Sequence, residues 1–486
     1  MNHKLTIRSL SVITLMISLM FLTALLVECA SDFRTILLLK WTLCVFVSLL
    51  ITLCLFFVSR NYERDIFKRE VLAIIVLGLL TAILVGMLPY LVFLDGCPVA
   101  NAFFESASGF TTTGSTAFED LSKFPNSLIF YRGMTQGVGG IVTIFFFAVL
   151  LPIFGAKTKS ICMSGLCVRP NETSFATVHS IIKYVLGIYF TLMISTALVF
   201  YFGGMSKLDA SCYAASIAST GGFSTPTGHK IFSASNGLQC FSMFIMTVSG
   251  MNFIALMKII SGEWKELREN EEMRWYFGIM GISTVLLGIF FTLISHHATI
   301  LANVKSALFH VISIITTTGL AIDDMSQFST AAKIVLLFLL LCGGCSGSTA
   351  GGLKICRLII VCKTCIKNMR RSFRPNVIFT TFLSKKQISS ADESENLGFI
   401  AIAGMILVLV MPILAVSVKG ASLQQILCSA CANFFNVGVA FARSAVPYFS
   451  MNGTAKFLYG TLMIVGRVEI YAATALLFPL FWKKSH

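Results

Sequence analysis

Charged residues are scarce in this chain of 486 residues, of which Asp, Glu, Lys and Arg make up only 12 %. In soluble domains about one quarter of the residues are charged, so half of the usual surface charge is missing. Hydrophobic residues make up 56 %, and the mean hydropathy is +0.84. This composition excludes a soluble enzyme, a disordered scaffold and a nucleic-acid-binding protein, and it indicates a polytopic membrane protein.

Catalytic patterns are missing as well. The chain has no HExxH or GxSxG motif and no phosphate-binding GxxxxGK[ST] loop, so an intramembrane enzyme or a nucleotide site is not expected. Most of the fifteen cysteines lie inside apolar runs, as Cys44, Cys54, Cys342 and Cys362 do. A thiol in such a place is a small core residue, and no covalently bound cofactor is expected.

Apolar runs long enough to cross a bilayer recur along the whole chain. A crossing takes about 20 residues, and ten spans are expected, at 10–28, 36–58, 70–95, 127–155, 178–203, 234–261, 275–297, 329–362, 396–418 and 454–482. The first run is longer than the apolar core of a signal peptide, and Glu28 does not suit a cleavage site, so this helix is expected to be retained.

The positive charges indicate how these spans are oriented. Most of the 37 Lys and Arg fall on one side of the expected spans, most densely at 354–386. The positive-inside rule therefore places both termini in the cytoplasm. The 354–386 stretch is expected mainly to mark this topology, with contact to a cytosolic partner or to anionic membrane lipid as the weaker alternative.

Four non-cytoplasmic segments are neither charged loops nor spans. Each carries a short apolar segment that runs into small residues and glycine, and these segments lie at 97–126, 206–232, 301–328 and 420–452. They predict re-entrant loops, in which a short helix descends and irregular backbone returns. The small-residue patches read SGFTTTGST, IASTGGFST, IITTTGLA and FFNVGVAF, and they align on Gly114, Gly221, Gly319 and Gly438.

The four patches predict an internal repeat. Each unit of helix, loop and helix contains two spans, so all four units enter the membrane in the same orientation and can surround one axis. The expected fold is therefore an all-α membrane protein with four parallel helix–pore loop–helix repeats around one pseudo-fourfold pore, plus two extra N-terminal helices.

Irregular backbone at membrane depth is tolerated only where it is buried in protein or lines water. Rings of carbonyl groups at glycine-containing turns can replace the hydration shell of a monovalent cation, and no Asp or Glu stands at the four glycines. Ordinary turns with chance similarity are the alternative. The expected filter residues are Thr111, Thr112, Thr113, Gly114, Ser219, Thr220, Gly221, Thr317, Thr318, Gly319, Asn436, Val437 and Gly438.

With these residues in view, the sequence resembles the Trk/Ktr/HKT superfamily of cation translocators, and most closely its TrkH branch. The resemblance runs from about residue 70 to the C-terminus and rests on the runs SGFTTTGST, GGFST, SIITTTG, GGCSGSTAGGLK and VGRVEIYA, together with GVGGIVTIFFFAVLLPIFG. It implies potassium uptake across a bacterial inner membrane, one filter glycine per repeat, a homodimer, and a cytosolic RCK-type (TrkA-like) nucleotide-binding regulatory subunit.

The resemblance also has departures. The fourth patch, FFNVGVAF, lacks the Asn-Asn-Leu-Gly-Pro-Gly character that is common in TrkH relatives. Relatives that favour sodium tend to carry serine in the first repeat, where this chain has Gly114, so potassium is favoured. The units are expected at 1–62 for the two N-terminal helices and, for the four repeats, at 63–170, 171–268, 269–392 and 393–486.

A glycine-rich run, GGCSGSTAGGLK, interrupts the eighth expected span at 343–354. A continuous helix is costly there, so the run predicts an unwound intramembrane gating loop, with a glycine-lined helix crossing as the alternative. Lys354 is expected at its cytoplasmic end. The gating residues expected are Gly343, Gly344, Gly347, Gly351, Gly352, Lys354 and Arg467.

Arg467 lies deep in the last expected span, where a charge must face protein or water. Below the filter it would repel cations and set the balance between open and closed states. An ion pair with Glu469 or another buried carboxylate is the alternative.

Asn252 is expected as a structural contact between helices or as a partner of the gating loop. Glu105 is expected to favour the start of its helix, and His310 is given no chemistry. Asp323 and Asp324 either concentrate cations at the mouth or are merely solvated.

The pattern as a whole predicts a gated potassium translocator driven by the membrane potential, with K⁺ as the transported ion. The alternative is a secondary transporter coupled to Na⁺ or H⁺. Such transporters often use inverted repeats and intramembrane acidic residues, whereas the repeats expected here are parallel.

Overall fold

The computed structural model describes residues 3–31, 34–60, 68–153, 175–294, 297, 299–384, 386–418, 420–438, 447–468 and 470–482. Several charged positions used for the topology prediction lie outside these ranges, namely Arg64, Lys157, Lys159, Arg169, Lys483 and Lys484. The same is true of Glu469, and of the end of the fourth patch from residue 439 onward.

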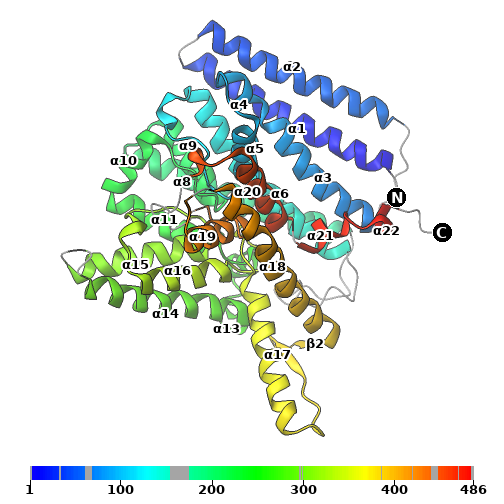
Figure 1. Ribbon diagram of the computed structural model, residues 1–486, viewed down its shortest axis with the longest axis vertical. Helices are drawn as coiled ribbons and strands as arrows, with labels where there is room; N and C mark the ends of the chain where they lie inside the picture. The colour runs from blue at the N-terminus through cyan, green and yellow to red at the C-terminus, as the bar shows by residue number, and fades with distance from the viewer. Residues whose placement is uncertain are drawn as a thin grey trace.

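Two long N-terminal helices, α1 (His3–Ala30) and α2 (Thr35–Val58), form an antiparallel pair at one side of the molecule (Figure 1). α1 packs on α3 (Lys68–Gly86), while α2 exposes large apolar side chains such as Leu39, Phe46 and Phe57. A contiguous apolar face of this kind fits a hydrocarbon solvent rather than water. The pair therefore lines the outside of the bundle, as expected for two extra helices.

After this pair, one arrangement recurs four times: a long helix, a short buried helix, an irregular segment and a second long helix. The long first helices are α3, α8 (Phe175–Phe202), α14 (Glu271–Leu293) and α18 (Ser390–Ser417). The short helices are α5 (Val99–Phe110), α9 (Lys207–Ala218), α15 (Ile300–Ile315) and α19 (Leu423–Phe434). The second helices are α6 (Asn126–Ile153), α11 (Asn236–Ser249) with α12 (Phe253–Ile260), α16 (Thr330–Cys342) with α17 (Ile355–Phe373), and α20 (Gly453–Arg467) with α21 (Ile470–Ala475).

Shorter elements connect these helices. They are α4 (Leu88–Phe93), α10 (Pro226–Ala234), α13 (Lys265–Glu269), α22 (Pro479–Trp482), and the 3₁₀ turns Leu121–Lys123, Met325–Gln327 and Tyr448–Ser450. One antiparallel hairpin, β1 (Thr381–Leu383) with β2 (Lys386–Ile388), pairs Thr381 with Ile388. The chain is thus almost entirely helical where it is described.

Within the described residues, six helices are long and apolar enough to cross a membrane, or seven if the bent pair α10–α11 counts as one span. The ten expected spans therefore do not all appear as single helices. The sixth is interrupted at 250–252 between α11 and α12, and α10 meets α11 at 102°. The eighth is interrupted at 343–354, and in the tenth α20 ends at Arg467 and α21 begins at Ile470. The breaks at 250–252 and 343–354 begin at Gly250 and Gly343. Because glycine lacks a β-carbon, continuation of the helix is unfavourable at these positions.

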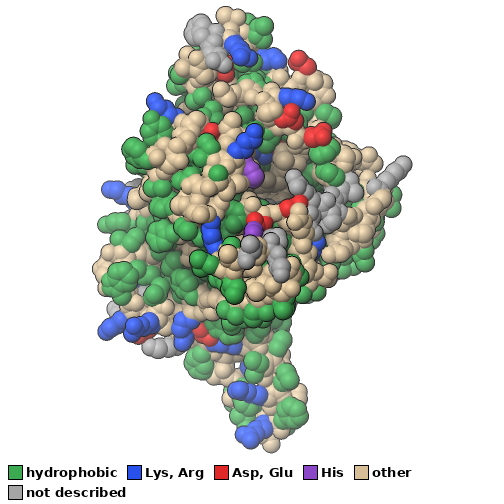
Figure 2. All heavy atoms as spheres, turned by 90° about the vertical axis from the view of Figure 1, so that its left-hand side faces the viewer, with side chains coloured by type: hydrophobic (Ala, Val, Ile, Leu, Met, Phe, Trp, Pro, Cys, Tyr) green, Lys and Arg blue, Asp and Glu red, His purple; other side chains and the backbone are tan. Residues whose placement is uncertain are grey.

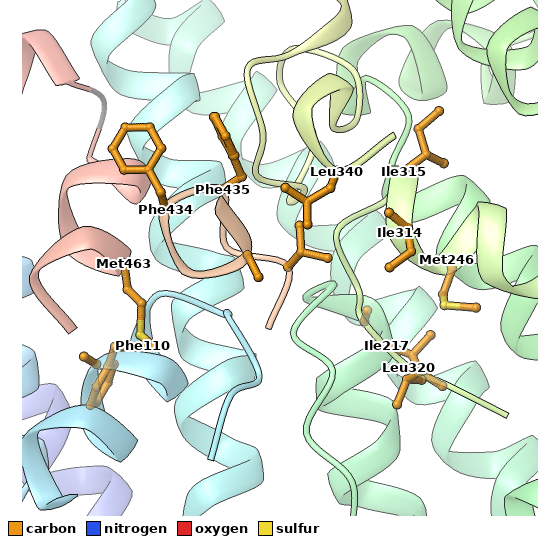
Figure 3. Close-up of a cluster of buried hydrophobic side chains, with 14 of the residues drawn as sticks. Phe110, Ile217, Met246, Ile314, Ile315, Leu320, Leu340, Phe434, Phe435 and Met463 are labelled. Carbon is orange, nitrogen blue, oxygen red and sulfur yellow. The ribbon is translucent and has the colours of Figure 1, made fainter. Parts of the chain in front are cut away.

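The four short helices form the centre of the molecule. Every residue of α5 from Ala102 to Phe110 is buried, although this helix stands where an ordinary loop would connect two spans. Side chains at their C-terminal ends, including Phe110, Ile217, Ile315 and Phe434, pack around the irregular segments that follow (Figure 3). The start of α19 is fixed by a capping box of Ser422 and Gln425.

The second helix of the third repeat extends beyond the bundle. α17 projects from the body at the bottom of Figure 1, with the hairpin beside it. Lys363 of α17 pairs with Glu271 at the start of α14, with 2.6 Å between its Nζ and the carboxylate. Because α17 carries part of the dense basic stretch, the positive-inside rule assigns it to the cytoplasmic side.

Candidate functional site

The four irregular segments share one backbone conformation. Each has a non-glycine residue with positive φ, followed two residues later by a glycine with positive φ. The non-glycine residues are Thr112 (52°), Thr220 (55°), Thr317 (57°) and Asn436 (55°). The glycines are Gly114 (88°), Gly222 (80°), Gly319 (73°) and Gly438 (73°). Left-handed backbone is costly for β-branched threonine, so its recurrence at equivalent positions marks a conformation that the surrounding structure imposes.

This pattern corrects the alignment of the second segment by one residue. Gly222, and not Gly221, corresponds to the filter glycine of the other segments, because each short helix ends four residues before it, α9 at Ala218 for instance. Gly221 instead occupies the position of Thr113, Thr318 and Val437. The sequence offered two adjacent glycines, and similarity of the patches alone could not choose between them.

Neighbouring segments make close backbone contacts with one another. A β-carbon on Gly114 would collide with the carbonyl oxygen of Gly221, and one on Gly222 would collide with that of Thr318. A β-carbon on Gly438 would collide with the carbonyl oxygen of Thr113. Segment one therefore meets segment two, segment two meets segment three, and segment four meets segment one. Such close approach of backbone to backbone requires glycine.

Side chains reinforce the contact between the first and fourth segments. Ser115 Oγ donates to the carbonyl oxygen of Gly438 at 3.0 Å, and Asn436 Nδ2 donates to Thr113 Oγ1 at 2.9 Å. The equivalent carbonyl oxygens of Thr113, Gly221 and Thr318 thus each lie where two of the segments meet. Chemically, this arrangement offers neutral, partly negative oxygen ligands of the kind that hard monovalent cations accept.

A buried ion pair lies beside the first irregular segment and contacts the residues that follow it. Glu105 Oε1 lies 2.5 Å from Nε of Arg132, and both side chains are almost completely buried. The Glu105 carboxylate also accepts hydrogen bonds from Thr116 Oγ1 and the Ala117 backbone N–H. The expectation that Glu105 favours the start of its helix was wrong, because Glu105 lies in the middle of α5.

Acidic residues support the second and third segments in a comparable way. Asp209 in α9 accepts hydrogen bonds from Thr225 and Thr227, which follow the second filter turn. Asp323 accepts a hydrogen bond from Ser306 Oγ and lies 3.4 Å from His297 Nε2. Burial raises the pKa of Asp323, but the Ser306 hydrogen bond and the charges of His310 and His297 lower it more, so the pKa lies below its ordinary value. Asp323 is therefore held by specific contacts and is not a merely solvated loop residue.

His310 lies in this same group. Its side chain is fully buried in α15, and its Nδ1 donates to the Ser306 carbonyl oxygen at 2.8 Å.

Figure 2 shows the face of the molecule that is on the left in Figure 1. This face is hollowed near its centre, with histidine and acidic side chains beside the hollow.

The run Gly343–Lys354 is an irregular loop between α16 and α17, as the glycine content predicts. Gly343, Gly347 and Gly352 have positive φ (67°, 75° and 81°). The Gly351 N–H donates to Thr317 Oγ1 at 2.7 Å, and the Gly352 N–H donates to the Phe435 carbonyl oxygen at 3.1 Å. The loop therefore lies directly against the third and fourth irregular segments.

Two side chains anchor the middle of this loop. Asn252 Nδ2 donates to the Ser346 carbonyl oxygen at 2.6 Å, and Glu272 Oε1 accepts from the Ser346 N–H at 2.6 Å. Asn252 also caps α12, accepting from the backbone N–H groups of Ile254 and Ala255. The expected contact of Asn252 with the glycine-rich loop is thus confirmed. Glu272 was not anticipated, because a glutamate at the start of a helix is ordinary and its sequence position gives no sign of the loop.

Arg467 reaches the same loop from the end of α20. Its Nη1 donates to the Thr349 carbonyl oxygen at 3.0 Å, while Nε and Nη2 are buried and have no partner among the described residues. Beside it is a cavity of about 20 Å³, roughly one water, lined in part by Gly351, Gly352 and Lys354. Lys354 lies at the end of the loop as expected, but it is only 6 % exposed and its Nζ donates to the Ala350 carbonyl oxygen.

Two CxxC pairs, Cys342–Cys345 and Cys362–Cys365, have a spacing that also occurs in zinc sites. In the structure the first pair is buried at the start of the loop, and the second is exposed on α17. No group of three or more His, Cys, Asp or Glu in the described part of the chain is placed to hold a metal ion. Packing remains the interpretation of these thiols.

Comparisons with known proteins agree on one family of cation transport proteins. Residues 88–480 match the model of the TrkH family, described as "Cation transport protein". The chain is 28 % identical over 449 residues to the Trk system potassium uptake protein TrkH of Escherichia coli (strain K12), covering 90 % of this chain and 91 % of that protein. It is 26 % identical over 397 residues to the Trk system potassium uptake protein TrkI of Halomonas elongata, covering 79 % of this chain and 78 % of that protein.

The fold is also similar to a solved structure. The crystal structure of the potassium transporter TrkH from Vibrio parahaemolyticus superposes with a TM-score of 0.89, covering 99 % of this chain and 100 % of that one. Sequence identity in this comparison is 24 %, so the likeness concerns the fold.

Proposed function

Because the chain belongs to the TrkH family of cation transport proteins, we propose that it forms the gated, potassium-selective pore of a potassium uptake system. The transported ion is K⁺, and the driving force is the membrane potential, worth about 2.3 kcal/mol per charge per 100 mV. The family is one of transport proteins rather than enzymes, and the proposal needs no cofactor.

One observation carries the proposal. Carbonyl oxygens from three different chain segments, those of Thr113, Gly221 and Thr318, each lie against the glycine of a neighbouring segment. Oxygens contributed in this way by successive segments can replace the water around a dehydrated monovalent ion. The filter we propose consists of Thr111–Gly114, Ser219–Gly222, Thr317–Gly319 and Asn436–Gly438, with Gly222 taking the role first assigned to Gly221.

The four units that contribute these segments are proposed to run from 63 to 170, 171 to 268, 269 to 392 and 393 to 486, after the N-terminal pair 1–62. The boundaries 170/171 and 268/269 fall between a second helix and the next first helix, whereas 392/393 falls three residues inside α18. Every unit then contributes one short helix whose C-terminal end, with its partial negative charge, points toward the filter segment.

The gate is proposed to be the loop 343–354 together with Arg467. The loop donates hydrogen bonds to Thr317 and Phe435, so it touches the filter while belonging to the helix pair α16–α17. Arg467 brings a positive charge to the loop at Thr349. In this arrangement the arginine opposes the passage of cations until the loop and α20 move.

The setting of the pore completes the proposal. The protein lies in a bacterial inner membrane with both termini cytoplasmic, acts as a homodimer, and is controlled by a cytosolic RCK-type (TrkA-like) nucleotide-binding subunit. The projection of α17 and the hairpin from the body supports a cytosolic contact at this end.

Flux in proteoliposomes tests the proposal. The purified protein, in vesicles with an inside-negative potential, should take up K⁺ faster than Na⁺. Uptake should persist when a protonophore abolishes the pH gradient and Na⁺ is absent. Uptake that requires Na⁺ or a proton gradient would instead establish the coupled secondary transporter.

A further inference from the structure

The second filter segment lacks a side chain that the other three possess. At the position of Thr113, Thr318 and Val437, this segment has Gly221. In the first and third segments the threonine hydroxyl pairs with another threonine hydroxyl two residues earlier, Thr111–Thr113 at 2.7 Å and Thr316–Thr318 at 2.9 Å. No such pair is possible at Gly221. The second filter segment therefore lacks this contact between hydroxyl groups.

Gln136 of α6 occupies the vacant place. A β-carbon on Gly221 would lie 2.5 Å from Gln136 Cδ, and the glutamine side chain is fully buried. Its Nε2 donates to the Gly221 carbonyl oxygen at 2.7 Å, while its Oε1 accepts from the Phe223 N–H at 3.1 Å. One side chain from the first repeat thus binds the backbone of the second repeat on both sides of Gly222.

The corresponding place in the fourth repeat is apolar. Gly139 in α6 lies against the Phe110 carbonyl group, and Gly466 in α20 lies against that of Phe434. Gln136 stands three residues before Gly139, and Met463 stands three residues before Gly466, so these two residues occupy equivalent positions. The fourth repeat therefore lacks the pair of side-chain hydrogen bonds that Gln136 makes, and these bonds are not required in every repeat.

We propose that Gln136 is a positioning residue for ion selectivity, which replaces the missing side chain at Gly221 and fixes the orientation of the Gly221 carbonyl group in the filter. This inference rests on the proposed function. Discrimination between ions of different size requires that the oxygens hold their positions, and a strand with two adjacent glycines has the greatest backbone freedom. Gln136 donates a hydrogen bond to the Gly221 carbonyl oxygen, so this is the oxygen whose direction it controls.

The test measures K⁺ and Na⁺ flux of the full-length protein in proteoliposomes. Gln136→Met keeps the volume but removes both hydrogen bonds, and Gln136→Ala removes the side chain. Each variant should lower the K⁺/Na⁺ flux ratio by about tenfold, the scale expected when hydrogen bonds to a buried backbone are lost. Gln239→Ala is the matched control, because Gln239 is also buried and donates to two backbone carbonyls, those of Phe232 and Ser233. It should leave the ratio unchanged.

A pair of compensating substitutions tests whether Gln136 replaces the side chain that is missing at Gly221. Gly221 does not have positive φ, so its backbone admits a side chain, and the three atoms nearest to an added β-carbon all belong to Gln136. Gly221→Thr alone should be impaired, and Gly221→Thr combined with Gln136→Ala should recover at least about threefold in the flux ratio over either single variant.

The outcomes distinguish this inference from the proposed function. If the wild-type protein shows no K⁺ flux, the proposed function fails. If wild type is selective and monodisperse Gln136→Met keeps the full K⁺/Na⁺ ratio, the positioning role is refuted while the pore stands. Failure of the double variant to recover would contradict the claim that Gln136 replaces a side chain missing at Gly221.

Discussion

The backbone N–H of Gly351 donates a hydrogen bond of 2.7 Å to the side-chain oxygen of Thr317. One residue belongs to the loop between α16 and α17, and the other belongs to the third filter segment. The proposed gate and the proposed filter are therefore in direct contact, and displacement of the loop must break a bond to the filter.

This contact predicts the behaviour of Thr317 variants. Thr317→Ala removes the acceptor and should release the loop, raising K⁺ flux by about threefold, the order expected for one neutral hydrogen bond. Thr317→Ser keeps the hydroxyl and is the control, with flux close to wild type. Equal flux in the two variants would contradict a restraint on the loop at this point.

Arg467 is predicted to act as an electrostatic barrier. Arg467→Ala should raise cation flux by about tenfold or more, because a charge a few ångströms away is worth over 1.4 kcal/mol at an effective dielectric constant near 20. The variant should also depend less on the regulatory subunit. Arg467→Lys keeps the charge and should remain closed, so flux in Arg467→Ala equal to that in Arg467→Lys would reject the barrier.

Glu272 should hold the loop in its observed position. Glu272→Ala leaves the buried Ser346 N–H without its acceptor, which costs about 1 to 3 kcal/mol. We expect increased K⁺ leak in liposomes, and faster proteolysis of the loop region. Glu272→Gln still offers an oxygen to Ser346 and should behave nearly as wild type; a leak as large in Glu272→Gln would assign the effect to the charge instead.

The pair Glu105–Arg132 should be required for the stability of the pore. Removing one partner leaves an uncompensated buried charge, so Glu105→Ala should lower the free energy of unfolding by about 3 to 5 kcal/mol. Thermal unfolding in detergent measures the loss. Removing both partners in Glu105→Ala/Arg132→Met should cost less than either single change, and simple additivity of the two losses would exclude coupling.

The sequence permits prediction of features that depend on local composition. The four short helices with their glycine turns, and the unwound loop at 343–354, follow from small residues at places where helix is unfavourable. Relationships through space are different. Nothing near Gln136 or Glu272 in the chain points to Gly221 or Ser346, which lie 85 and 74 positions away. The choice between Gly221 and Gly222 likewise depended on backbone φ, which adjacent glycines leave undetermined.

Substitution of Gly114 tests the central proposal most directly. Gly114 has φ +88°, and an added β-carbon would strike the carbonyl oxygen of Gly221. Gly204, with φ +94° and open space around it, provides a control for backbone strain alone. K⁺ and Na⁺ uptake should be compared in liposomes for wild type, Gly114→Ser and Gly204→Ser. The account predicts that only Gly114→Ser loses its preference for K⁺ while remaining folded and permeable to Na⁺; a folded Gly114→Ser protein with the wild-type K⁺/Na⁺ ratio would contradict it.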